Sequence, residues 1–146
     1  MSKYNFRLQK LLDIRLDKEE ESKRNFTEAQ NEKLKVESKL QQLNENYEKY
    51  RNISGTESAV KRRITHIYLN AINYSINEAC EELKLKEKTL QDKRYDLNEK
   101  RVERKTVEIL KEKGEAAFLK EQNLIEQRNN DEFALYGFIR NHREGR

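Results

Sequence analysis

Two long stretches of this chain carry apolar residues at alternating intervals of three and four positions, the spacing of a coiled-coil seam. The first stretch covers residues 26–50 and the second covers 69–97, and only three seam positions in the two are polar. A helix with such a seam buries it against another helix. We expect the following apolar seam residues to pack in this way: Phe26, Val36, Leu40, Leu69, Ile76, Leu83, Leu90 and Leu97.

The composition favours long helices over other folds. The 146 residues include no Pro, no Trp and only four Gly, and 40% are charged, against about 25% in an average soluble domain. Sandwiches, barrels and α/β enzymes need more turn residues and a larger apolar core. The periodic seams in turn argue against disorder.

A short turn joins the two stretches. Gly55 is the only Gly in the first 113 residues, and Ser54 with Glu57 fits a capping box, although Thr56 is a competing N-cap. We expect an all-α fold: an antiparallel two-helix coiled-coil hairpin forming a single domain over residues 1–146. Its expected parts are helix one at about 3–51, a turn at about 52–58, and helix two at about 59–142.

The position of the turn predicts the register. If pairing begins next to the turn, the numbers of facing residues add up to roughly 110. Glu19, within the polar stretch from Arg15 to Ser22, then faces Lys93. Two interpretations stay open: a polar pair that fixes register at a cost in stability, or a stretch that is loose and hydrated.

The same register leaves the longer second helix overhanging at the C-terminus, unpaired from about residue 110 and able to kink at Gly114. A lone helix cannot bury the apolar residues found there. We favour burial of these residues by a partner protein. Two alternatives stay open: the segment self-associates, or Gly137 lets the chain end fold back or fray. The residues are Phe118, Leu119, Leu124, Ile125, Phe133, Leu135, Tyr136, Phe138 and Ile139.

Nothing in the sequence indicates catalysis. His66 and His142 have no partners at metal-ligand spacing, and phosphate-binding and hydrolase motifs are missing. We therefore expect no enzyme, no cofactor, no metal and no small-molecule ligand. Cys80 is the only cysteine, and neither a signal peptide nor a membrane-spanning stretch is evident. The expected location is the cytoplasm.

Function should then reside in surfaces. A net charge of +4 without a concentrated basic block makes nucleic acid an unlikely partner, so an RNA-binding helical arm is the weakest alternative. Tyrosines gather near the turn. Tyr47 and Tyr50 occupy seam positions, whereas Tyr68 and Tyr74 lie off the seam and are better contact candidates.

The opening FRLQKLLDIR, residues 6–15, resembles the start of the FliJ family, a component of bacterial flagellar type III export. Weaker likeness covers almost the whole chain, including Tyr50-Arg51, Tyr68-Leu69, Arg104-Lys105 and DEFA at 131–134. Only the opening string is distinctive. A generic coiled-coil scaffold or homodimer unrelated to export is the alternative.

The resemblance implies a two-helix coiled coil similar to the central stalk of a rotary ATPase. FliJ-like proteins insert the end bearing the chain termini into the ring of the flagellar export ATPase, promote its assembly, contact the membrane export gate (FlhA-like) and handle export chaperones. The implied location is the cytoplasm, at the inner face of the membrane below the flagellum. The implied ring contacts are Phe118, Leu124, Ile125, Phe133, Tyr136 and Phe138. The implied gate contacts are Leu43, Tyr50, Tyr68 and Ile72, with Ser75 and Ala79 departing from the family pattern.

Overall fold

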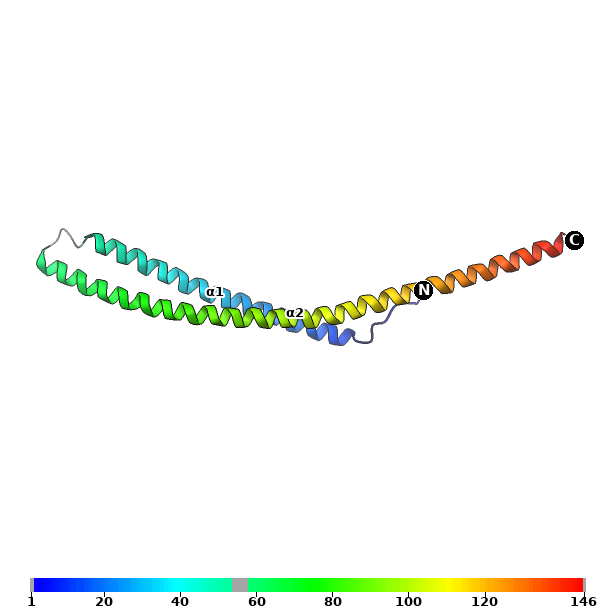
Figure 1. Cartoon of the computed structure of the whole chain (residues 1–146), viewed down its shortest axis with the longest axis horizontal. Coiled ribbons are helices and arrows are strands. Elements are labelled where there is room, and N and C mark those ends of the chain that lie inside the picture. Colours follow the sequence, from blue (N-terminus) through cyan, green and yellow to red (C-terminus); the bar gives the residue numbers. More distant parts are fainter. Residues whose placement is uncertain (1, 54–57, 146) are drawn as a thin grey trace. The chain divides into compact units, whose positions relative to one another are not determined.

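Two long helices make up nearly all of the computed structural model, which describes residues 2–53 and 58–145 (Figure 1). Helix α1 runs over Gln9–Ile53 and helix α2 over Ala59–Glu144. The two helices pack against each other as an antiparallel hairpin, and the described ranges contain no strand. The all-α hairpin expected from the seams is confirmed. The expected capping residues Ser54, Thr56 and Glu57 lie outside the described residues.

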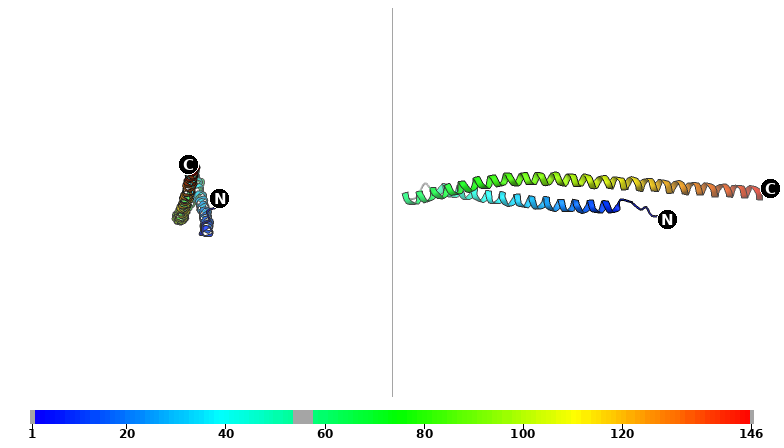
Figure 2. Two further views of the ribbon diagram at one scale, coloured as in Figure 1. Left: turned by 90° about the vertical axis from the view of Figure 1, so that its right-hand side faces the viewer. Right: turned by 90° about the horizontal axis from the view of Figure 1, so that it is seen from below.

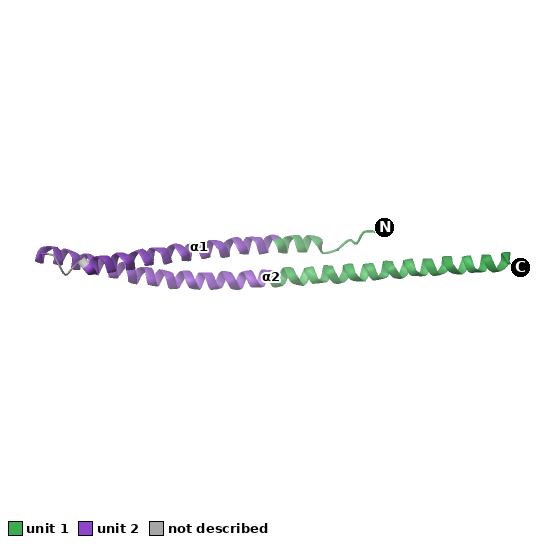
Figure 3. Cartoon of the chain, turned by 90° about the horizontal axis from the view of Figure 1, so that it is seen from above, with its two compact units in different colours: residues 1–16, 102–146 green, residues 17–101 purple. Residues whose placement is uncertain are grey.

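The hairpin divides into two compact units (Figure 3). Unit 2 comprises residues 17–101 and contains most of α1 with the first half of α2. Unit 1 comprises residues 1–16 and 102–146 and contains the start of α1 with the second half of α2. Each unit is described separately below.

Unit 2 has a narrow apolar core along a single line between the helices. Each helix contributes only its seam, because every third or fourth residue turns toward the partner. The two helices lie side by side in both views of Figure 2. The buried apolar residues of this unit are Ala29, Val36, Ile72, Ala79, Leu90 and Leu97. Half-buried seam residues are Phe26, Leu40, Leu69, Ile76 and Leu83.

The register of unit 2 differs from the expected one. Lys33 Nζ lies 3.7 Å from Glu87 Oε1, and the Tyr50 and Tyr68 ring centroids are 4.7 Å apart. The numbers of facing residues therefore add up to about 119 rather than 110. The seam repeats every seven residues, so sliding one helix by a heptad restores the same apolar alignment. The pattern fixes the register only to within a heptad, and the pairing lies about one heptad beyond the expected position.

A polar layer interrupts the seam in unit 2. Glu19 and Ser22 are buried, so the loose and hydrated interpretation of this stretch is wrong. Glu19 Oε1 lies 3.8 Å from Lys23 Nζ and 3.9 Å from Arg101 Nε. Its facing cation is thus Arg101 and not Lys93, about one heptad farther along α2. The Ser22 hydroxyl donates to the Asp96 carboxylate at 2.8 Å.

Unit 1 begins with a short non-helical segment. Helix α1 starts at Gln9 rather than near Lys3, and residues 2–8 lead into it. The buried core residues of the unit are Leu12 and Val107. Lys111 Nζ donates to Gln9 Oε1 at 2.9 Å, so α1 reaches farther along α2 than expected.

The N-terminal segment extends the pairing still farther. The Tyr4 ring lies over Gly114 and stacks at a tilt on Phe118, with 5.6 Å between ring centroids. A Cβ at Gly114 would overlap the Tyr4 hydroxyl. Helix α2 continues through Gly114, whose role is to allow this close approach, and no helix break marks the position. Phe118 is therefore half-buried rather than part of an unpaired overhang. Every described residue after Gln122 is exposed.

Candidate functional site

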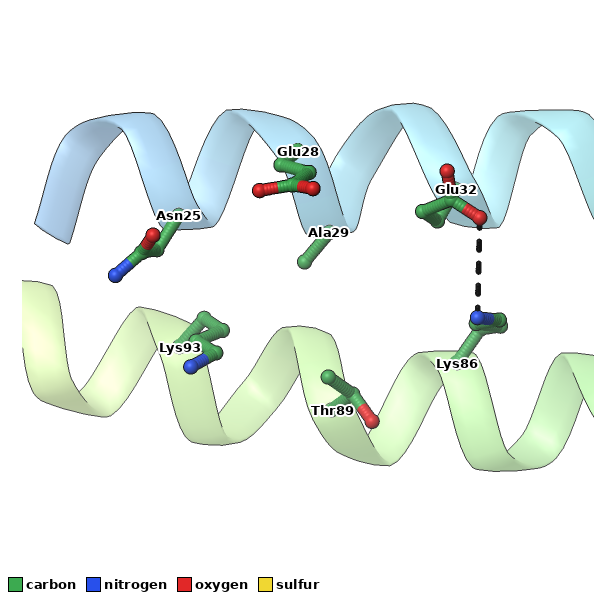
Figure 4. Close-up of a pocket in the computed structure, with 7 residues that line it drawn as sticks. All are labelled: Asn25, Glu28, Ala29, Glu32, Lys86, Thr89 and Lys93. Atoms are coloured by element: carbon green, nitrogen blue, oxygen red, sulfur yellow. Dashed lines mark ion pairs between the residues drawn. The ribbon is translucent and has the colours of Figure 1, made fainter.

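A shallow hollow in unit 2 is the first candidate for a binding site (Figure 4). It has a volume of about 210 Å³ and forms where the short Ala29 side chain leaves space opposite Thr89. Its rim carries charges of both signs, and Lys86 Nζ lies 3.8 Å from Glu32 Oε2. A hydrogen bond from Lys35, with the charges of Lys35 and Lys86, lowers the pKa of the Glu32 carboxyl. These charges neutralise one another along an open groove, so the hollow has no features of a ligand site.

Catalytic and metal chemistry have no structural support within the described ranges. No group of three or more His, Cys, Asp or Glu side chains there is arranged to hold a metal ion. Cys80 is half-buried next to the seam residue Ala79. The remaining candidates are the surfaces that expose apolar side chains.

The end of α2 in unit 1 exposes a large apolar surface, which we call the C-terminal surface. It consists of Leu124, Ile125, Phe133, Leu135, Tyr136, Phe138 and Ile139. Phe133 is 75% exposed, and the Phe138 ring stacks on His142 at 6.0 Å between centroids. At about 100° per residue, these side chains point in directions spread over about 220° of the helix circumference, with charged residues such as Arg128 and Glu132 between them. One partner helix, which covers a single stripe, could not cover all of them.

Near the turn, unit 2 has a tyrosine surface formed by Tyr50, Tyr68 and Tyr74. The Tyr50 and Tyr68 rings meet edge to face, which orients both side chains. Tyr68 and Tyr74 are exposed, whereas Tyr50 is half-buried. The hydroxyl ends of the exposed tyrosines leave this surface able to form both apolar and polar contacts.

The four expected gate contacts differ in how exposed their side chains are. Tyr50 and Tyr68 touch each other, and Leu43 is a half-buried seam residue. Ile72 is only 6% exposed because its seam position points it toward α1. It is a core residue, and its burial argues against the expected gate contact at this position.

The expected ring contacts also fall into two groups, which differ in exposure. Leu124, Ile125, Phe133, Tyr136 and Phe138 are all exposed. Phe118 belongs with Tyr4 and Gly114 instead, an arrangement that sequence reasoning missed. Two features of the sequence could have predicted this contact. They are the aromatic ring of Tyr4 before the first helix and the single Gly114 at a seam position.

Comparison with known families decides between an export component and a generic coiled coil. The family described as "Flagellar FliJ protein" matches residues 3–143. The chain belongs to the FliJ family. This membership implies a role related to flagellar protein export. No curated protein and no solved structure matches the chain.

The helices of this FliJ protein are too polar to cross a bilayer. Among the described residues, no helix offers a window that is long and apolar enough to span a membrane.

Proposed function

We propose that this FliJ protein is a non-catalytic coupling component of flagellar type III export, and that its C-terminal surface enters the ring of the export ATPase. The observation that carries the proposal is the set of exposed apolar side chains on the last turns of α2, whose directions spread over about 220° of the helix. A ring encloses a helix from most sides, whereas a single partner helix covers only one stripe. By stabilising subunits around it, the inserted helix would promote ring assembly.

The tyrosine surface is the proposed contact for the FlhA-like export gate, which would hold the protein at the inner face of the membrane below the flagellum. Tyr50 and Tyr68 support this role because tyrosine is enriched at protein interfaces. Leu43 contributes through its half-buried edge. The handling of export chaperones is part of the same proposal and follows from family membership alone.

Coupling requires that the two contact regions be joined. Helix α2 supports this because its 86 residues run without interruption from the turn-proximal region to the C-terminal surface. A Gly-rich insertion between Leu83 and Leu90 should therefore abolish export in a motility assay while leaving ring binding intact. Normal export with the insertion would contradict a mechanical role.

Ring binding is tested by co-sedimentation with the flagellar export ATPase of the same organism. Phe133→Ser with Phe138→Ser should abolish binding, because a ring lined for apolar contacts would then meet hydroxyl groups. The matched control is Leu34→Ser with Val102→Ser, which removes two apolar side chains of comparable exposure from the paired regions. Equal binding by both double variants would overturn the proposal.

The exposed apolar residues also favour a second candidate function, a structural coiled coil that self-associates through the C-terminal surface. Sedimentation equilibrium of the full chain separates the two. A monomer that binds the ATPase supports the coupling role, whereas a stable dimer that does not bind it supports the scaffold.

A further inference from the structure

A second apolar stripe lies on α2 in unit 2, outside the seam and outside the tyrosine contact of Tyr50 with Tyr68. It comprises Val60, Ile64, Ile67, Ala71 and Tyr74, and all five side chains are exposed. Their spacing of four, three, four and three residues is that of a coiled-coil seam. We call this set the outer stripe.

Helix α1 cannot cover the outer stripe. At about 100° per residue, the stripe is centred about 150° around α2 from the seam positions Leu69 and Ile72, which face α1. The pairing of Tyr50 with Tyr68 also places the first two turns of α2 beyond the last paired turn of α1. Val60 and Ile64 belong to those turns.

The basic residues beside the stripe indicate which kind of partner helix it can bind. Residues 58–77 contain Lys61, Arg62 and Arg63 but no Asp or Glu, in a chain of which 40% is charged. With Ile64 and Ile67 as seam positions, Lys61 and Arg63 fall at the flanking positions where ion pairs between coiled-coil helices form. Both residues are exposed. A partner helix with acidic flanks would complement them.

The stripe is too short and too narrow for other occupants. It ends at Glu78 and Glu81, which take the next two seam-spaced positions. Its arc of about 80° is narrower than the apolar face of about 100° or more that is usual for an amphipathic helix, and it matches the narrower seam of a coiled coil. A second copy of this chain would bring another acid-free basic stripe and therefore like charges.

We propose that the outer stripe docks an amphipathic helix of another protein, about two heptads long, with apolar seam residues flanked by Asp or Glu. The docked helix would then lie on the side of α2 that faces away from α1. The outer stripe shares only Tyr74 with the tyrosine surface, and the variants that test it change no residue of the proposed ring or gate contacts.

The test uses the full chain and two labelled helical peptides of 21 residues with Leu at both seam positions. One probe has Glu at the flanking positions, and the matched probe has Lys. Fluorescence anisotropy should show binding of the Glu probe at least about tenfold tighter than the Lys probe. Equal binding of both probes, or no binding of the Glu probe, would overturn the proposal.

Variants then locate the contact. Ile64→Gln with Ile67→Gln should weaken the Glu probe by about tenfold or more, since each buried Ile is worth more than that factor. The control is Leu85→Gln, because Leu85 is as exposed (66%) as Ile64 (62%) but lies beyond the stripe. Lys61→Glu with Arg63→Glu should reverse the preference toward the Lys probe. Retention of the wild-type preference would refute the charge argument.

Two further measurements address the other occupants. Flotation with vesicles containing phosphatidylglycerol should leave the protein unbound, and sedimentation should show no dimer that depends on Ile64 and Ile67. Vesicle binding or dimerisation that these two substitutions abolish would overturn the assignment to a partner helix.

Discussion

The seam of unit 2 and the C-terminal surface of unit 1 use similar residues in opposite ways. In unit 2, Val36, Leu90 and Leu97 occur once in every three or four residues and are buried by the facing helix. On the C-terminal surface, Phe133 and Phe138 belong to a set of apolar side chains that point in directions spread over more than half of the helix circumference and remain exposed. The presence of a facing helix, rather than apolar content, decides which residues the chain buries by itself.

The difference also extends to polar residues. Unit 2 buries Glu19 and Ser22 in its seam and provides each with a partner. The C-terminal surface exposes apolar groups that receive no cover from the described part of the chain. One region is thus covered within the chain and the other is not, and substitutions should separate the two.

The largest expected effect on stability is in the seam. Leu97→Ala should lower the free energy of unfolding by about 2–3 kcal/mol, because a buried Leu loses its packing and leaves a cavity. Phe133→Ala should change it by less than about 0.5 kcal/mol. Urea titration followed by circular dichroism measures both, and a comparable loss at Phe133 would contradict the distinction.

Glu19→Leu should raise stability by about 1 kcal/mol. The change replaces a buried carboxylate with an apolar seam residue, and such replacements are often stabilising. The side chain of Lys23 is 43% exposed and that of Arg101 is 52% exposed, so neither cation would be left buried. A clear drop in Tm would show that the Glu19 layer stabilises the hairpin as well as specifying its register.

The Tyr4 contact should appear as coupling in a double-mutant cycle. Gly114→Ala improves helix propensity by about 1 kcal/mol, but its Cβ would displace the Tyr4 hydroxyl. The full gain should therefore appear only in a Tyr4→Ala background, with a smaller gain in the wild type. Equal gains in both backgrounds, measured by thermal unfolding, would mean that Tyr4 does not pack on Gly114.

The smallest expected effect concerns pH. Because Lys35 and then Lys86 lower the pKa of Glu32 in the folded protein, the ionised carboxylate stabilises the fold above its ordinary, unfolded pKa of 4.5. This contribution is lost as the pH falls through the lower folded pKa. Glu32→Gln should slightly flatten the fall of Tm between about pH 6 and pH 3. An unchanged slope would show that the Lys35 and Lys86 contacts are too weak to stabilise the fold.

Much of the fold could be predicted from the seams alone. The spacing indicated two antiparallel helices, and the residues it selected, such as Val36 and Leu90, are buried. The register could not be predicted because the seam repeats every heptad and tolerates a shift of that length. Glu19 consequently faces Arg101 rather than Lys93.

The candidate surfaces were harder to predict. The start of α1 was placed too early because residues 2–8 include apolar groups that pack on α2 without forming a helix. Phe118 was assigned to the overhang for the same reason. The exposed residues from Leu124 onward were predictable because no seam on α1 remains to face them.

The central claim, that the C-terminal surface acts on a partner, is tested most directly by the rate of the flagellar export ATPase from the same organism. The full chain is compared with a chain ending at Lys120, which keeps the packing of Tyr4 on Phe118. The account predicts that the full chain raises the rate of ATP hydrolysis and that the shortened chain, with an unchanged Tm, does not. Equal stimulation by both chains, or none by the full chain with an active ATPase, would contradict it.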